Sequence, residues 1–234
     1  MEKPIINITS LVKRFPVGSG EFTALSSINL TVNKGEFMGL VGPSGSGKTT
    51  LLNIIGSLDT PSEGEVEVMG HKVSVLNHKE AAHLRNYNIG FIFQSYNLLP
   101  VYTVFENVEF ALLLQKQNTT NRKKAVMEAL EWVGLSDKAD SRPSQLSGGE
   151  SQRVSIARAM VKRPALVLAD EPSANLDARN SHNILQTMKK LNKELNTTFI
   201  FSTHDEKVMQ YLDRIVSLRD GMVEKDSIMV QAKI

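Results

Sequence analysis

Short runs of apolar residues predict the buried strands of this chain. The clearest runs are Glu36 to Val41, Ile89 to Phe93, Ala165 to Ala169 and Thr198 to Ser202. Each is about the length of one strand and is followed by glycine or polar residues, as expected for a strand buried in a sheet. The chain therefore predicts a sheet with an apolar interior.

Alternating positions near the N-terminus predict a different kind of strand. Ile5 to Phe15 forms a first segment, and in Ala24 to Val32 the residues Ile28, Leu30 and Val32 fall on one face. A turn-rich stretch separates the two segments, so we expect an antiparallel flap ahead of the buried strands. Val66, Val68 and Val73 suggest another short pair of strands, broken at Gly70.

Helical spacing dominates the middle of the chain. The segments with this period are Leu51 to Gly56, Leu98 to Leu114, Arg122 to Val133 and Ser181 to Leu195, with a polar loop at Gln115 to Asn121. Ile215 to Glu224 predicts a hairpin around Asp220-Gly221, and the last ten residues a frayed tail. We predict an α/β fold with a mixed central sheet, an antiparallel flap and a helical subdomain at about 95–160, in one domain over 1–234.

Composition narrows the class of protein. The chain has 234 residues, 41% of them apolar, with 27 basic against 25 acidic side chains and no cysteine. The balanced charge offers no footprint for nucleic acid. No signal peptide is visible and no apolar run approaches the ~20 residues of a membrane helix. His71, His78 and His83 match no zinc-ligand spacing, so we expect them to be solvated.

A glycine-rich segment lies between a predicted strand and a predicted helix. It reads Gly42-Pro43-Ser44-Gly45-Ser46-Gly47-Lys48-Thr49-Thr50 and fits the pattern of Gly, four residues, then Gly-Lys-Ser/Thr. Such a loop points backbone N–H groups at phosphate oxygens, and the helix presents its positive end to them. Lys48 can reach the β- and γ-phosphates, and the Thr49 hydroxyl is placed to hold Mg²⁺. A glycine turn that binds nothing is the alternative, which the strand and helix disfavour.

Polar residues follow three of the predicted core strands, at the edge where α/β sheets bind ligands. Gln94 could bind the metal or the attacking water, or could cap a loop. Asp170 suits the water shell of Mg²⁺, and Glu171 suits polarising the water that attacks the γ-phosphate. His204 is a candidate γ-phosphate sensor, although a lone histidine is usually structural. Phe15 could stack on adenine or fill the core.

A second anion-binding constellation precedes a predicted helix. Ser147, Gly148 and Gly149 stand at its N-terminus, followed by Glu150. A single nucleotide has no use for two such sites on one chain. Two chains facing head to tail would use both.

With these motifs identified, the chain resembles the ABC transporter ATPases over essentially its whole length. The resemblance assigns the parts in the family's order: Phe15 as the adenine-stacking aromatic, Gly42 to Thr50 as the phosphate loop, Gln94 as the lid glutamine, Leu146 to Glu150 as the signature, Asp170 and Glu171 as the metal and base carboxylates, Ser173 to Asp177 as the interface loop, and His204 as the switch histidine.

Within the family the chain looks most like the lipoprotein-releasing (LolD), MacB-type and FtsE ATPases. The segments that carry this likeness are Gly56 to Gly64, Asn97 to Pro100, Leu146 to Glu150 and Asn175 to Asn180. Glu150 stands where most members have glutamine, as it does in LolD-type chains. Phe15 replaces a commoner tyrosine and Ser173-Ala174 the usual Thr-Gly. No reacting group is lost, so the resemblance implies activity.

The resemblance implies how the parts act together. Two copies would close as a homodimer on two ATP molecules, each held by one phosphate loop and by the other copy's residues Ser147, Gly148, Gly149, Glu150 and Asp177. Glu171 and His204 would hold the attacking water, while Lys48 and Mg²⁺, the latter bound by Thr49, Gln94 and Asp170, would neutralise charge.

The resemblance also implies partners and a location. An integral-membrane subunit would dock near Gln94 to Glu106, on the cytoplasmic side of the bacterial inner membrane. The cargo would be a lipoprotein, or a substrate of MacB-like export. The alternatives are an FtsE-like regulatory ATPase, a soluble cassette acting on DNA or ribosomes, and a scaffold that binds ATP without cleaving it.

Overall fold

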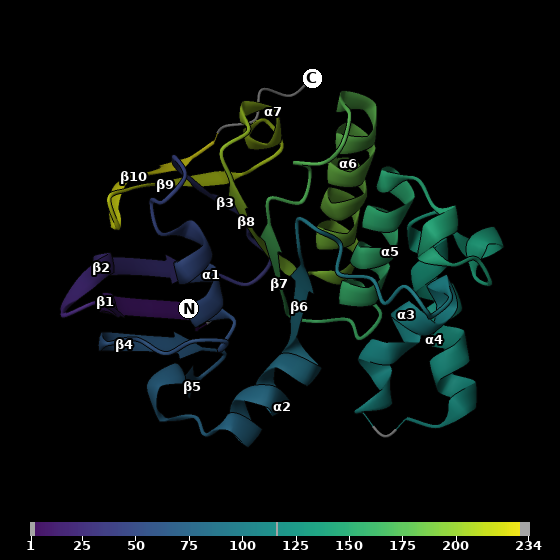
Figure 1. Ribbon diagram of the computed structural model, residues 1–234, viewed down its shortest axis with the longest axis horizontal. Coiled ribbons are helices and arrows are strands. Elements are labelled where there is room, and N and C mark those ends of the chain that lie inside the picture. The colour runs from purple at the N-terminus through teal and green to yellow at the C-terminus, as the bar shows by residue number, and fades with distance from the viewer. Residues whose placement is uncertain (1–2, 116, 230–234) are drawn as a thin grey trace. The chain divides into compact units, whose positions relative to one another are not determined.

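The computed structural model describes residues 3–115 and 117–229, and the chain divides into two compact units (Figure 1). The first unit comprises the chain up to Arg85 and from Thr198 onward, and the second comprises Asn86–Thr197. Within the described ranges, no helix combines the length and the apolar character that crossing a bilayer requires.

An antiparallel sheet of four strands lies in the first unit, in the order β2-β1-β4-β5. Its strands are β1 (Ile6–Val17), β2 (Gly20–Val32), β4 (Glu63–Val68) and β5 (His71–Lys72). The alternating apolar residues of β1 and β2, among them Ile6, Ile8, Ile28 and Leu30, are buried. This is the predicted flap.

Four strands of the same unit lie side by side in the order β10-β9-β3-β8. They are β3 (Phe37–Val41), β8 (Thr198–Thr203), β9 (Arg214–Arg219) and β10 (Met222–Ile228). β3 runs parallel to both of its neighbours, and all five of its residues are buried. The Phe37 ring lies 5.5 Å from that of Phe199 and 4.7 Å from that of Phe201, centroid to centroid. These continuous apolar runs are the buried strands that the sequence predicted.

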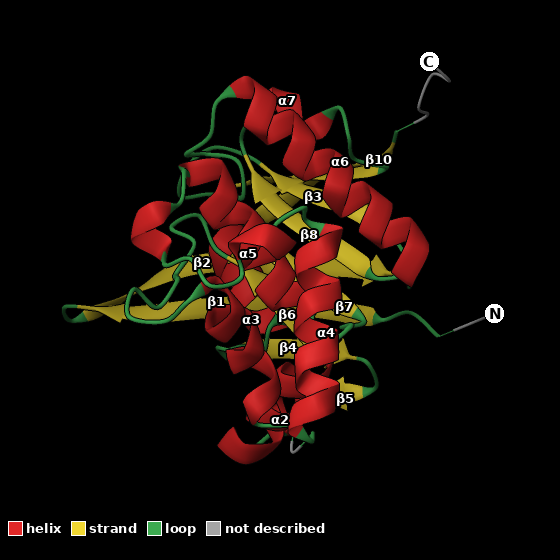
Figure 2. Ribbon diagram, turned by 90° about the vertical axis from the view of Figure 1, so that its right-hand side faces the viewer, coloured by secondary structure: helices red, strands yellow, loops and turns green. Residues whose placement is uncertain are grey.

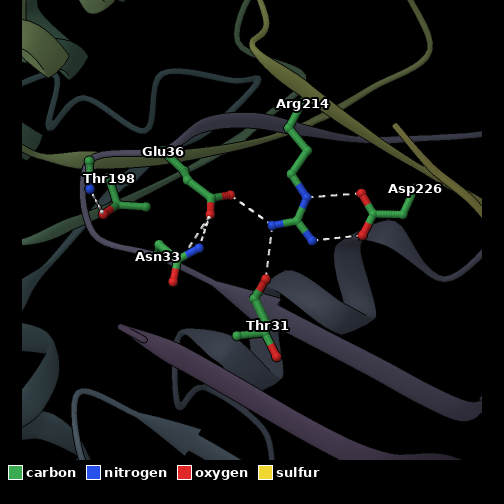
Figure 3. Close-up of polar contacts among 7 residues, drawn as sticks. Thr31, Asn33, Glu36, Thr198, Arg214 and Asp226 are labelled. Carbon is green, nitrogen blue, oxygen red and sulfur yellow. Dashed lines mark hydrogen bonds and ion pairs between the residues drawn. The ribbon is translucent and has the colours of Figure 1, made fainter. Parts of the chain in front are cut away.

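An ionic network ties the edges of the two sheets of the first unit together (Figure 3). The guanidinium of Arg214 donates two hydrogen bonds to the Asp226 carboxylate, at 2.9 and 2.7 Å. It donates two more, both 2.8 Å long, to the Glu36 carboxylate and to the backbone carbonyl of Thr31. Asn33 donates to the other oxygen of Glu36. The network therefore joins the end of β2 to β9, to β10 and to the residue before β3.

The second unit combines a parallel strand pair with four long helices. The strands are β6 (Ile89–Ile92) and β7 (Leu166–Asp170), and the helices are α3 (Val104–Leu113), α4 (Thr119–Trp132), α5 (Gly148–Met160) and α6 (Ala178–Leu195). Figures 1 and 2 both show α3, α4 and α5 grouped together. Val108, Leu112, Val126, Leu130 and Val154 are buried there. The predicted α/β class, with mixed and antiparallel strands, is confirmed.

The predicted starts of α3 and α4 were wrong, and α1 and α6 each begin three residues earlier than predicted. α3 begins only at Val104, because Thr103 and Glu106 form a capping box, and residues 98–103 are a loop. α4 begins at Thr119, inside the predicted loop, because the side chain of Asn118 accepts a hydrogen bond from the Asn121 N–H.

Two helices were missed, and two segments were misjudged. The helices α2 (His78–Asn88) and α7 (Glu206–Met209) were not predicted. Four of the last ten residues extend β10 to Ile228 and are not a frayed tail, and 230–234 lie outside the described residues. The first unit also contains α1 (Lys48–Ile55) and a 3₁₀ helix at Val73–Val75, where a strand was expected.

Candidate nucleotide site

The predicted phosphate loop joins β3 to α1 in the first unit. Gly45 and Gly47 have positive φ angles of 81° and 99°, and Gly47 is the N-cap of α1. The loop wraps around its lysine: the Lys48 ammonium donates to the carbonyls of Gly42 at 2.7 Å and Pro43 at 2.9 Å. The ammonium therefore lies within the loop, at the N-terminus of a helix, where phosphate oxygens are favoured.

The glycines of the loop differ in how closely they are packed. A Cβ atom on Gly47 would lie 2.8 Å from the Ala24 carbonyl oxygen and 2.7 Å from the Leu25 side chain, so only glycine fits there. A Cβ on Gly45 would meet nothing within 4 Å, so that side of the loop is open. The Ser46 hydroxyl is buried without a hydrogen-bond partner among the described residues. A buried polar atom left unsatisfied in an open cradle suits a polar ligand.

The predicted histidine follows the strand next to the phosphate loop. β3 and β8 are parallel, and Val41 pairs with Thr203. Gly42 and His204 are therefore the next residues at the same edge of the sheet. Ligands of open α/β sheets bind at this edge, which supports a role for His204 at the phosphates.

Phe15 lies near the end of β1, with a cation against its ring. The Lys13 ammonium is 4.9 Å from the ring centroid, and it also donates to the Asp59 carboxylate at 2.6 Å and to the Thr60 carbonyl at 2.9 Å. A cation over the face of an aromatic ring is a favourable contact, and the hydrogen bonds to Asp59 and Thr60 keep the Lys13 ammonium in this position. Lys13 was missed in the sequence, where no motif distinguishes this buried lysine from the others of the chain.

The predicted metal and base residues share one edge of the second unit. β6 and β7 are parallel, with Ile92 paired with Ala169, so Gln94 follows one strand while Asp170 ends the other and Glu171 follows it. The Asn175 amide donates to the Gln94 carbonyl at 3.0 Å, which joins the loops after the two strands. Gln94 and Asp170 carry side-chain oxygens, the kind of ligand that Mg²⁺ prefers.

Ser147 caps α5 at the predicted second anion site. Its hydroxyl accepts from the Glu150 N–H at 3.3 Å, while the Glu150 carboxylate accepts from the Ser147 N–H and hydroxyl, both at 2.8 Å. These hydrogen bonds, the backbone one foremost, hold the pKa of the Glu150 carboxyl below its usual value. An ionised carboxylate therefore stands beside Ser147, at the predicted second anion site.

The structure brings the interface loop against the signature glycines. Asp177 caps α6 and accepts from the Asn180 backbone N–H at 2.8 Å and from its side-chain amide at 2.7 Å. These bonds, the backbone one first, lower the pKa of Asp177. A Cβ on Gly149 would lie 2.6 Å from the Asn180 amide oxygen. Close packing against Asn180 therefore explains the second glycine of the signature.

Arg158, at the C-terminal end of α5, holds the loop after Gln94 and was also missed in the sequence. Its guanidinium donates to the carbonyls of Asn97 at 2.5 Å and Tyr96 at 2.6 Å. Tyr96 and Asn97 have positive φ angles of 60° and 50°, which side chains rarely adopt. Burial lowers the pKa of Arg158. Its targets are backbone carbonyls, so no sequence pattern reveals them.

The strand, phosphate loop and helix define the class as an α/β nucleotide-binding protein of the phosphate-loop type. The family model described as "ABC transporter" matches residues 25–174. The chain belongs to the ABC transporter ATPase family, whose cassettes hydrolyse ATP, and it is an ATPase of that family.

Curated relatives cover nearly the whole chain. An uncharacterized ABC transporter ATP-binding protein of Methanocaldococcus jannaschii, MJ0796, is 42% identical over 226 residues, which are 95% of this chain and 96% of that protein. The lipoprotein-releasing system ATP-binding protein LolD of Bacteroides thetaiotaomicron is 43% identical over 222 residues, 95% of this chain and 100% of LolD. The chain is therefore similar to a full-length nucleotide-binding subunit.

Solved structures agree with this assignment. A dimeric post-hydrolysis state of the MJ0796 cassette, bound to ADP and Pi, has a TM-score of 0.88 at 39% identity and covers 98% of this chain and 100% of its own. Another dimeric MJ0796 structure has a TM-score of 0.89 at 40% identity, with the same coverage. Clostridium perfringens cbiO1, part of the cbiONQ transporter complex, has a TM-score of 0.87 at 28% identity, covering 97% of this chain and 89% of its own.

Proposed function

We propose that this ATPase works as a homodimer that closes on ATP and drives a separate integral-membrane subunit. The observation that carries the proposal is the presence of two anion sites in one chain. Lys48 lies inside a phosphate loop, and Ser147 caps the N-terminus of α5. The dimeric form of the similar MJ0796 cassettes supports a second copy as the user of the α5 site.

In the proposed dimer each ATP would lie between one copy's phosphate loop and the other copy's Ser147, Gly148 and Gly149. Phe15 would stack on the adenine, and Asp177 and Glu150 would complete the contacts. Glu171 would take the proton of the attacking water, and His204 would orient the γ-phosphate. Mg²⁺ bound by Thr49, Gln94 and Asp170 would supply electrostatic stabilisation of the transferred phosphoryl group.

The proposed membrane partner docks on the surface from Gln94 to Glu106. Val101 and Tyr102 there are exposed apolar side chains, which suit a protein contact. The similarity to LolD supports lipoprotein release as the process powered, with the ATPase held on the cytoplasmic face of the inner membrane.

A trapping experiment tests this proposal. Glu171→Gln should bind ATP, accumulate a dimer in size-exclusion chromatography and release phosphate at less than about a hundredth of the wild-type rate. Adding Ser147→Ala should weaken the trapped dimer while leaving ATP binding by the separate monomers unchanged. Phosphate release at the wild-type rate by Glu171→Gln would remove Glu171 from the role of base. A monomer throughout turnover would refute the shared site.

A further inference from the structure

One fully buried polar side chain on α5 contacts the loop that follows Glu171. Gln152 is 0% exposed and lies five residues after Ser147. Its side-chain amide donates a 2.7 Å hydrogen bond to the backbone carbonyl of Pro172. Its amide oxygen is buried and has no partner among the described residues. Burying this amide is costly, and its one observed bond ends next to Glu171.

The backbone of Glu171 adopts an unfavourable conformation. Its φ angle is +46°, in the left-handed region that residues with a Cβ rarely occupy. The carbonyl of Glu171 accepts from the Ala174 N–H at 3.2 Å, which closes a turn. A conformation of this kind persists only where surrounding contacts fix it, and it commonly marks a functional site.

The next residue limits how this turn can be held. Pro172 has no backbone N–H, so its carbonyl oxygen is the only backbone group of this residue that can form a hydrogen bond. Gln152 supplies the donor for that carbonyl from a neighbouring helix. The bond therefore anchors the backbone directly after Glu171.

We propose that Gln152 is a positioning residue for the carboxylate of Glu171. The inference rests on the proposed role of Glu171 as the base. Gln152 and Ser147 belong to the same helical element, so an ATP-driven shift at the Ser147 end would reach the Glu171 turn through the Pro172 carbonyl. Gln152 thereby links engagement of the second copy's nucleotide to placement of the base.

The test is the variant Gln152→Met, which keeps the length of the side chain and removes the donor. We expect kcat for phosphate release to fall about 10- to 100-fold, the loss typical of a misplaced catalytic group. The affinity of the monomer for a fluorescent ATP analogue should stay within about twofold, because the phosphate loop is unchanged. In the Glu171→Gln background, Gln152→Met should still form the ATP-trapped dimer.

Ser155→Ala is the matched control. Ser155 is also fully buried on α5 and has a hydroxyl without a hydrogen-bond partner among the described residues. Its kcat should match the wild type. Gln152→Glu, which presents a buried carboxylate to the Pro172 carbonyl, should lose at least as much kcat as Gln152→Met. Urea unfolding of each variant identifies assay conditions in which all of them are folded.

The outcomes separate this inference from the proposed function. An unchanged kcat in Gln152→Met, with Glu171→Gln inactive, overturns the positioning role alone. An equal loss in Ser155→Ala, or a loss explained by weaker ATP affinity, also overturns it. Wild-type activity of Glu171→Gln would instead overturn the base assignment.

Discussion

Replacing Arg214 by methionine removes the centre of the ionic network shown in Figure 3. The guanidinium makes four hydrogen bonds, two to Asp226 and one each to Glu36 and the Thr31 carbonyl. Methionine fills much of the same volume, so the change deletes the charge and the donors rather than the packing. The variant measures how much the network stabilises the first unit.

The burial of each partner sets the size of the effect. The side chains of Arg214 and Glu36 are 16% and 21% exposed, whereas that of Asp226 is 41% exposed. The bonds from Arg214 to Glu36 and to the Thr31 carbonyl should therefore stabilise the fold as charge-assisted hydrogen bonds in a partly buried site do. The ion pair with Asp226 should contribute about as little as an exposed surface ion pair. Glu36 keeps its bonds from Asn33 in the variant. We expect the free energy of unfolding to fall by about 2–3 kcal/mol.

Urea unfolding at pH 7, with hydrogen exchange of the β3 and β9 amides, measures this loss. A double-mutant cycle with Asp226→Asn isolates the pair, for which we expect a coupling of about 0.5–1 kcal/mol. If Arg214→Met unfolds within about 0.5 kcal/mol of the wild type, the network contributes no more than an ordinary surface side chain, and the stabilising role given to it is wrong.

The pH dependence gives an independent check. The hydrogen bond from Arg214, followed by its charge, lowers the pKa of Asp226 in the folded state. The stabilisation is therefore fully present above the unfolded pKa of about 4 and is lost as the pH falls through the lower folded pKa. Wild type should lose more stability than Asp226→Asn in that acid range, and parallel curves would contradict the assignment.

Two further predictions concern the second unit. The buried Asn107 side chain accepts a hydrogen bond from the Leu99 N–H and donates to the carbonyls of Leu99, Tyr102 and Thr103. Asn107→Ala should therefore destabilise the second unit by about 2 kcal/mol and speed thermolysin cleavage between residues 98 and 103. An unchanged cleavage rate would refute this. Glu150→Gln should keep the cap but remove a charge beside Ser147, so that the ATP-trapped dimer tightens roughly 3- to 10-fold in sedimentation equilibrium, and a weaker dimer would contradict the argument.

Most of the core could be predicted because its strands are buried along their whole length. Phe37–Val41 and Leu166–Asp170 read as apolar runs wherever they occur in a sequence. The helix α2 left no such signal, since Leu84 is its only buried residue among those described. The hairpin of β9 and β10 was predicted as far as Glu224, but its continuation to Ile228 was not, because Lys225 and Asp226 are exposed charged residues on the outermost strand of the sheet.

The start of α3 was misjudged although the sequence held a usable signal. Thr103 followed three residues later by Glu106 is the pattern of a capping box, and both reciprocal bonds form. The apolar residues before Thr103 have helical spacing by coincidence. Local hydrogen bonding at the cap therefore outweighed periodicity in fixing where the helix begins.

The contacts that organise the candidate site share a chemical reason for escaping the sequence. Gln152 donates to Pro172, Arg158 to Tyr96 and Asn97, and Asn175 to Gln94, and every acceptor is a backbone carbonyl. Since every residue carries a backbone carbonyl, the accepting residues cannot be recognised from their amino-acid types.

It follows that only the donors are specified by their side chains. Substitutions in the accepting loops can leave these bonds intact if the backbone path is kept, whereas substitutions of Gln152, Arg158 or Asn175 remove them outright. Gln152 and Arg158 lie on α5, whose N-terminus is capped by Ser147. The helix that carries the signature is therefore also the element that holds the loops after Gln94 and Glu171, and its interior polar residues belong to the site as much as its N-terminus does.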